Sequence, residues 1–335
     1  MKLHKKTVQW MAVVLLVLWC GVFLRMETTE KSMVRALILH PDAEAWTVEL
    51  LYQFPEAAAD ASDASAEIRV CSATEKTLAQ AVQAAERSLP KTANYRLCEY
   101  LLWDEDATTW SSIREVEEFL QVEPISRLSA RVFLLTGESL QDAPSEEAES
   151  DEDTKTASAD SLPGVLLQAV EEQAACAPRL YEIETGMLLP VLRLEKDTAV
   201  LEEQGVLITE KGNTQLSAGE TAMARLLIER VTPQSIELET GTVFLRRGVL
   251  SVEAENDGFA VRLNCQRQAG TPHVSDDQCD ELETLCIRTI TLCWENGWDL
   301  LHLGAVCALK KGEAAFLTTK NACPAVRADV MFLEF

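Results

Sequence analysis

CSATEKTLAQAVQAAERSLPKTANYRLCEYLLWDED, residues 71–106, is the stretch that decides the fold. A short strand expected over residues 68–71 leads into Ser72-Ala73-Thr74-Glu75, where serine and glutamate stand at capping-box spacing. The helix expected behind it carries apolar residues at helical spacing and is stopped by Pro90. Hydrophobic residues resume in a strand expected over residues 96–103. The stretch therefore predicts a strand, a helix and a second strand in succession.

The same alternation of elements continues on both sides of this stretch. Downstream, a helix is expected over residues 108–122 and a strand over 130–135. Upstream, strands are expected over residues 34–40 and 46–53. In the second, one face is expected to be buried and the other to face solvent, because Trp46, Val48, Leu50 and Tyr52 alternate with Thr47, Glu49, Leu51 and Gln53. This order predicts a layer of helices packed on a sheet.

An acidic insert, residues 137–163, interrupts the pattern. It contains nine Asp or Glu residues against a single Lys and has no aromatic side chain. Such a segment buries too little apolar surface to offset its ordering entropy, so we expect it to be disordered. It serves either as a solvated spacer, which we favour, or as a recognition tract.

The C-terminal part again carries helix and strand signals. Ser217-Ala218-Gly219-Glu220 is a second capping box, opening a helix to about Arg230, and Ser275-Asp276-Asp277-Gln278 caps a long helix that ends near Gly297. Asn256-Asp257-Gly258 is a hairpin signal. Strands are expected at 187–194, 205–209, 236–238, 243–253, 259–265 and 326–332.

The overall prediction is an α+β protein with a multi-domain extracytoplasmic body of mixed sheets flanked by helices, behind one N-terminal membrane anchor. An N-terminal α/β domain is expected over residues 28–195, with the acidic insert inside it. A C-terminal α+β domain is expected over residues 200–335, with a further division near residue 233 as an alternative. A chain of 335 residues is long enough for two or three domains.

The anchor is expected at residues 8–24, VQWMAVVLLVLWCGVFL, which carry no charge. A helix needs roughly 17–25 apolar residues to cross a bilayer. Lys2, Lys5 and Lys6 precede the run, which favours a cytoplasmic N-terminus and an exported body. The alternatives are a cleaved signal peptide, which lacks its Ala-x-Ala site here, and lipidation at Cys20. Trp19 stands where a lipidation site needs a small residue, so we favour the uncut helix.

The charge balance excludes one class of partner. The net charge of −24 argues against binding to nucleic acid or to anionic lipid, because both require a cationic surface. It predicts a strongly solvated body that a negatively charged membrane repels.

The ten cysteines are expected to be mainly buried thiols, with some disulfides as the alternative. Cys279, Cys286 and Cys293 recur every seven residues on one helix face, about 10 Å apart at 1.5 Å rise per residue and too distant to bond. No Cys-x-x-Cys pair is present, and the four histidines do not stand at zinc spacing. We therefore expect no metal and no cofactor.

No catalytic residue is predicted. The sequence has no Gly-x-Ser-x-Gly elbow, no phosphate-binding loop and no His-Glu-x-x-His helix. Cys98 and Cys176 are nucleophile candidates by residue type, but both are expected to be buried thiols. Asp299 and Gly304 stand in the turn after the long helix, where Asp299 either organises the turn, which we favour, or contacts a partner subunit.

Four stretches together resemble the Ger(x)C family, the C subunits of bacterial spore germinant receptors. They are residues 71–106, then IREVEEFLQVEPISRLSARVFLLTGES (113–139), GVLITEKGNTQLSAGETAMARLLIER (205–230) and DELETLCIRTITLCWENGWDLLHLG (280–304). Each is a pattern of apolar positions, and their order behind an apolar N-terminal run carries the resemblance. Trp19 before Cys20, and His302 where the family usually has Gly or Phe, mark a divergent member.

The resemblance implies a non-enzymatic subunit of a nutrient-sensing complex on the outer face of the spore inner membrane. Its implied partners are an A-type subunit and a multi-spanning, transporter-like B-type subunit. The alternatives are a free-standing anchored protein that binds a small extracytoplasmic ligand and, less favoured, an envelope hydrolase.

Overall fold

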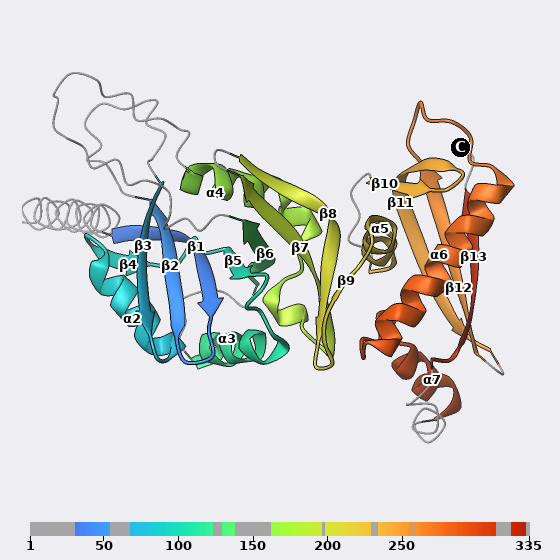
Figure 1. Cartoon of the computed structure of the whole chain (residues 1–335). Coiled ribbons are helices and arrows are strands. Elements are labelled where there is room, and N and C mark those ends of the chain that lie inside the picture. Colours follow the sequence, from blue (N-terminus) through green and yellow to red (C-terminus); the bar gives the residue numbers. More distant parts are fainter. Residues whose placement is uncertain are drawn as a thin grey trace, which may run out of the picture.

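The computed structural model describes residues 31–53, 68–122, 129–137, 162–195, 198–228, 234–255, 258–312 and 323–332. These residues form a mixed α+β fold with two β-sheets and six α-helices (Figure 1). The expected anchor at residues 8–24 and nearly all of the acidic insert lie outside the described residues. In the described ranges, no helix combines the length and the apolar character needed to cross a membrane.

The first sheet has nine strands and a parallel centre. Along the sheet the order is β3-β2-β1-β5-β6-β7-β8-β9, with the short β4 paired beside the start of β1. β1, β5, β6 and β7 run parallel, whereas β2, β3, β8 and β9 are antiparallel to their neighbours. The strands are β1 (Lys31–Pro41), β2 (Trp46–Gln53), β3 (Ile68–Glu75), β4 (Thr92–Asn94), β5 (Tyr100–Asp104), β6 (Arg131–Gly137), β7 (Gly186–Glu195), β8 (Thr198–Thr209) and β9 (Gly212–Gln215).

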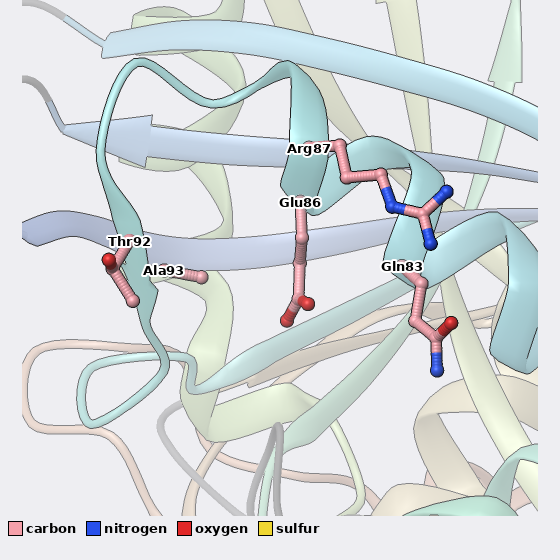
Figure 2. Close-up of a pocket in the computed structure, with 5 residues that line it drawn as sticks. All are labelled: Gln83, Glu86, Arg87, Thr92 and Ala93. Atoms are coloured by element: carbon pink, nitrogen blue, oxygen red, sulfur yellow. The ribbon is translucent and has the colours of Figure 1, made fainter.

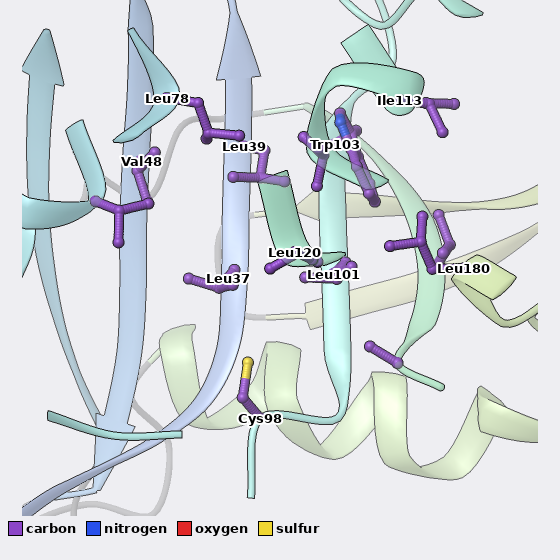
Figure 3. Close-up of a cluster of buried hydrophobic side chains, with 14 of the residues drawn as sticks. Leu37, Leu39, Val48, Leu78, Cys98, Leu101, Trp103, Ile113, Leu120 and Leu180 are labelled. Atoms are coloured by element: carbon purple, nitrogen blue, oxygen red, sulfur yellow. The ribbon is translucent and has the colours of Figure 1, made fainter. Parts of the chain in front are cut away.

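Helices cover both faces of this sheet. α2 (Leu78–Ser88) and α3 (Trp110–Val122) bury their apolar stripes in one core, and Figure 3 shows part of it, with Trp103 among the leucines of β1 and β5. α4 (Leu162–Gln173) packs in a second core on the opposite face. Because both faces are covered, the central strands are buried on both sides, as parallel strands usually are.

The second sheet has four strands in the order β10-β11-β12-β13. β10 (Gln234–Leu238), β11 (Gly241–Ala254) and β12 (Gly258–Arg267) are antiparallel neighbours, and β13 (Ala325–Phe332) pairs parallel to β12. The predicted hairpin is confirmed, since Ala254 pairs with Phe259 across it. α6 (Asp276–Glu295) crosses the sheet in front of β12 and β13 in Figure 1. α7 (Leu303–Lys311) follows it.

The core of the second sheet extends to the first sheet. α5 (Ala218–Leu227) buries Met223, Ala224 and Leu226 in this core, together with Leu188 of β7 and Leu207 of β8. The first sheet therefore runs through residue 215, past the position near 195–200 where we expected a domain boundary. β7 and β8 pair with each other across that position. The division into domains stays a prediction.

Two of the three capping predictions are confirmed and one is wrong. Ser217 caps α5 with Glu220 in a complete capping box, and Ser275 does the same for α6 with Gln278. Ser72 to Glu75, in contrast, continue β3, because they pair with β2 as far as Trp46. Thr77 caps α2 instead, where its hydroxyl accepts from the Gln80 N–H. Pairing along the full length of β2 outweighs the local capping signal.

Other elements differ at their ends. The strand expected from Arg96 begins only at Tyr100, because the preceding chain turns back with a bond from the Cys98 N–H to the Tyr95 carbonyl. The helix expected to reach Arg230 ends at Leu227. The short β4 and the whole of α7 were not predicted.

Candidate functional site

The turn that contains Asp299 and Gly304 has a defined geometry. The Asp299 carboxylate accepts from the Leu303 N–H at 2.7 Å and from the Gly304 N–H at 2.8 Å. These amides open α7, where the first N–H groups of a helix lack intrahelical partners. Asp299 therefore organises the turn and caps the helix. A contact from Asp299 to a partner protein stays a prediction.

This turn also packs against the first sheet. His302 has a left-handed backbone, with φ of 52°, and its Nδ1 lies 3.2 Å from Glu184 Oε2, just before β7. Trp298 is buried against the start of β7 at Gly186. The turn is thus part of the junction between the two sheets, and Trp298 belongs to the core.

The cysteines are free thiols throughout the described ranges. Cys279, Cys286 and Cys293 lie on one face of α6 as predicted, and burial raises the pKa of Cys286 and of Cys293 to about 12. Such thiols are largely protonated at neutral pH and are poor nucleophiles. The candidate nucleophile Cys98 is fully buried among the core leucines in Figure 3. Cys176 is half-buried in η2 (Ala174–Cys176).

A carboxylate–imidazole–carboxylate cluster lies at one end of the first sheet. His40 Nε2 is 3.3 Å from Glu49 Oε1, and His40 Nδ1 is 3.4 Å from Asp104 Oδ2. The sheet brings the three together because β1 lies between β2 and β5, so that the last residues of β1 and β5 stand side by side. Carboxyl ends of parallel strands are where α/β sheets commonly place functional side chains.

The environment of this cluster favours a proton on the imidazole. Burial lowers the pKa of His40, but hydrogen bonds and charge from Glu49 and Asp104 raise it, and the net shift is upward from 6.5. Next to Asp104, burial together with the charges of Glu202, Asp106 and Asp104 raises the pKa of Glu105. The cluster can hold a proton in a strongly acidic setting. It does not form a nucleophile–base pair, because both ring nitrogens face carboxylates.

The sequence did not single out this cluster. Glu49 was expected on the solvent side of a half-buried strand, but its side chain is only 1% exposed, on the same face of β2 as the core residue Leu51. A usable signal was present in β2, where Leu50 and Leu51 are adjacent apolar residues on opposite faces. Adjacent apolar residues indicate a strand that is buried on both sides.

A shallow pocket of about 330 Å³ lies between α2 and β4. Figure 2 shows the Glu86 carboxylate between β4, with Thr92 and Ala93, and the Gln83 and Arg87 side chains of α2. Glu86 also accepts a 2.8 Å hydrogen bond from the Tyr95 hydroxyl, and burial and the Glu86 charge raise the pKa of Tyr95. With one apolar lining residue, the pocket differs from the largely apolar sites that enclose drug-sized ligands.

No metal centre emerges from the described ranges, where no group of three or more His, Cys, Asp or Glu residues is arranged to hold an ion. Cys20, the lipidation candidate, lies outside the described residues, so its state stays a prediction.

Comparisons with known proteins give one structural neighbour. No protein-family model matches the chain, and no curated protein matches it. Among solved structures, the mixed two-sheet fold is similar to that titled "Crystal Structure of the GerBC protein", with 9% identity over 89% of this chain and 97% of that chain. The TM-score is 0.46. A likeness of this degree assigns no function.

Proposed function

We propose that the chain is a non-enzymatic, membrane-anchored subunit of a nutrient-sensing spore germination receptor, on the extracytoplasmic face of the spore inner membrane. Its partners in this proposal are an A-type subunit and a multi-spanning B-type subunit. The observation that carries the proposal is the order of the four stretches that resemble the C subunits, behind an apolar N-terminal run.

The elements formed by these stretches support the proposal. Residues 71–106 and 113–139 contribute consecutive elements of the first sheet and its helices, from β3 to β6. Residues 205–230 supply the end of β8, all of β9 and α5, and residues 280–304 supply most of α6 and the Asp299 turn. The resemblance therefore concerns helices and strands that build both sheets and their junction, rather than one local motif.

The described side chains also favour a role without catalysis. His40 is engaged on both ring nitrogens by carboxylates, and Cys98 is enclosed by the core. A nucleophile needs both access to substrate and an available base. Neither residue meets both conditions.

The test of this proposal is nutrient-triggered ion release from spores that lack the chain. We expect release to be lost, and to be restored both by the full-length chain and by residues 28–335 joined to an unrelated single-span anchor. Residues 28–335 exported without any anchor are expected not to restore it. Normal release from spores that lack the chain, with every nutrient that triggers the parent strain, would overturn the proposal.

A free-standing ligand-binding protein is the second candidate. The pocket between α2 and β4 favours it, since about 330 Å³ lies at the lower end of the usual size of small-molecule sites. The purified chain is then expected to show a thermal shift with a single amino acid or sugar in the absence of partners. Arg87→Ala should remove that shift, because Arg87 is the one cation in the lining. An unchanged melting temperature with every compound would exclude this candidate.

A further inference from the structure

The second sheet has one face against helices and one face that is exposed. The inward residues of β12 and β13, such as Val261, Leu263 and Val330, pack in the core with α6. The alternate residues of the same strands face away from α6, as the pleat requires. The outer face carries Phe244, Arg246, Arg247, Val249, Ser251 and Glu253 of β11, Ala260, Arg262, Asn264 and Gln266 of β12, Arg327, Asp329 and Met331 of β13, and Glu237 of β10.

Apolar side chains are exposed at the centre of this outer face. Val249 of β11, Asn264 of β12 and Met331 of β13 are direct neighbours across three strands. Val249 is 47% exposed and Met331 is 44% exposed. Phe244, on the same face of β11, is 38% exposed. Exposed apolar residues gathered on one surface, with polar residues around them, mark interaction sites.

The outer face also reverses the charge of the rest of the chain. It carries four arginines and no lysine against three carboxylates, Glu237 of β10, Glu253 of β11 and Asp329 of β13. The whole chain has 30 basic and 54 acidic residues. A local excess of positive charge on a strongly acidic protein attracts negatively charged partners to this face and keeps them away from the others.

Two of the arginines are available for such a partner. Arg262 pairs with Glu253 at 3.8 Å, and Arg327 pairs with Glu255 at 2.9 Å. Arg246 and Arg247 are exposed and form no ion pair with any residue that the structure describes. They stand together because the register of β11 against β12 shifts between Leu245 and Arg247. The irregularity thus presents two adjacent guanidinium groups beside the apolar centre.

We propose that this outer face is a docking surface for an acidic patch on another protein subunit, with Arg246 and Arg247 pairing with its carboxylates around an apolar centre. The inference rests on the proposed function, in which the chain belongs to a multi-subunit complex. Phe, Met and Arg are enriched in protein–protein interfaces and Lys is depleted. The outer face has this composition, and it favours a protein partner over an anionic lipid surface, which the overall charge of −24 repels.

The test is site-specific photo-crosslinking of the full-length chain in its native membranes. A benzophenone amino acid replaces Val249 in one strain, and in a control strain it replaces Val122, which is 78% exposed at the end of α3. We expect a single protein adduct at position 249 and none at position 122. The double variant R246E/R247E should lower the yield at position 249 at least tenfold. R69E/R96E, with two exposed arginines in the first-sheet half, should leave it unchanged.

Several outcomes would overturn the proposal. They are no adduct at position 249, an adduct only with lipid, an adduct with a second copy of the chain, or an adduct of equal yield in R246E/R247E. A second experiment, purification of the chain without the photoreactive residue, shows whether only the docking surface is wrong or the proposed function as well. If that chain brings a multi-spanning protein with it while position 249 gives no protein adduct, the docking surface is wrong and the receptor proposal stands. If it brings none, both are wrong.

Discussion

Gly186, at the start of β7, lies directly against Trp298, in the turn after α6. A Cβ atom at Gly186 would come within 2.8 Å of the Cβ and Cγ atoms of Trp298 and 2.9 Å of Thr209 Cγ2. Atoms of β7, β8 and the turn thus meet at one point where the first sheet joins the second core. Close packing of this kind leaves no room for an added methyl group.

Gly186→Ala should therefore destabilise the protein. We expect a loss of about 1–3 kcal/mol in the free energy of unfolding, because overpacking shifts the neighbouring atoms. Urea denaturation of the full-length chain in mild detergent measures the change. Gly219→Ala is the matched control, since a Cβ there would lie at an ordinary 3.6 Å from Leu285 and α5 favours alanine. Equal stability of Gly186→Ala and the parent chain would show that the junction is loosely packed.

Glu220 is a buried link between α5 and α6. Its carboxylate is 6% exposed, accepts from the Ser217 N–H at 2.9 Å and lies 2.8 Å from Arg288 Nε. Glu220→Ala should cost about 2–3 kcal/mol, because it removes both interactions and leaves a cap donor without its acceptor. Arg288→Ala should cost about 0–1 kcal/mol, since this arginine is 71% exposed. A reversed order of the two losses in urea denaturation would contradict this account of the link.

The His40 cluster should make stability depend on pH. The pKa of His40 is raised above 6.5 in the folded protein. The stabilisation that the protonated imidazole gives the folded state is therefore fully present below pH 6.5 and is lost as the pH rises through the folded-state pKa. His40→Gln removes this pH-dependent stabilisation. The stability difference between the parent chain and His40→Gln should therefore be larger at about pH 6 than at about pH 9. A stability difference that grows with pH would mean that burial, and not the carboxylates of Glu49 and Asp104, determines the direction in which the pKa of His40 shifts.

Asp299→Ala should weaken the turn that opens α7. The variant loses the acceptor of the Leu303 and Gly304 N–H groups, and loss of a cap costs typically about 1 kcal/mol. Asp299→Asn keeps one acceptor and should lose less. Asp280→Ala, at an exposed position within α6, serves as the control. Equal urea midpoints for Asp299→Ala and Asp280→Ala would show that Asp299 does not stabilise the start of α7.

The sequence predicted the elements whose signals are local. The strands β1 and β2, the caps Ser217 and Ser275, and the cysteine face of α6 all appear where they were expected. Each depends on neighbours in the chain or on a single turn of helix, so one sequence contains enough information. The helices α2 and α3 were found for the same reason.

The parts that were missed depend on contacts between distant segments. The strand order places Asp104 beside His40, and Glu49 is buried on the second face of β2, at which only the adjacent Leu50 and Leu51 hinted. The false cap at Ser72 has the same origin, because pairing with β2 extends β3 through it. The outer face of the second sheet became visible only once the register set Val249, Asn264 and Met331 side by side.

The measurement that tests the receptor-subunit assignment most directly is the protein composition of the complex purified from detergent-solubilised spore membranes with the tagged full-length chain. The account predicts that mass spectrometry finds a multi-spanning, transporter-like protein and an A-type subunit. Both should be absent when an unrelated single-span protein with the same tag is the bait. Recovery of the chain alone, in detergents that preserve other membrane complexes from the same spores, would contradict it.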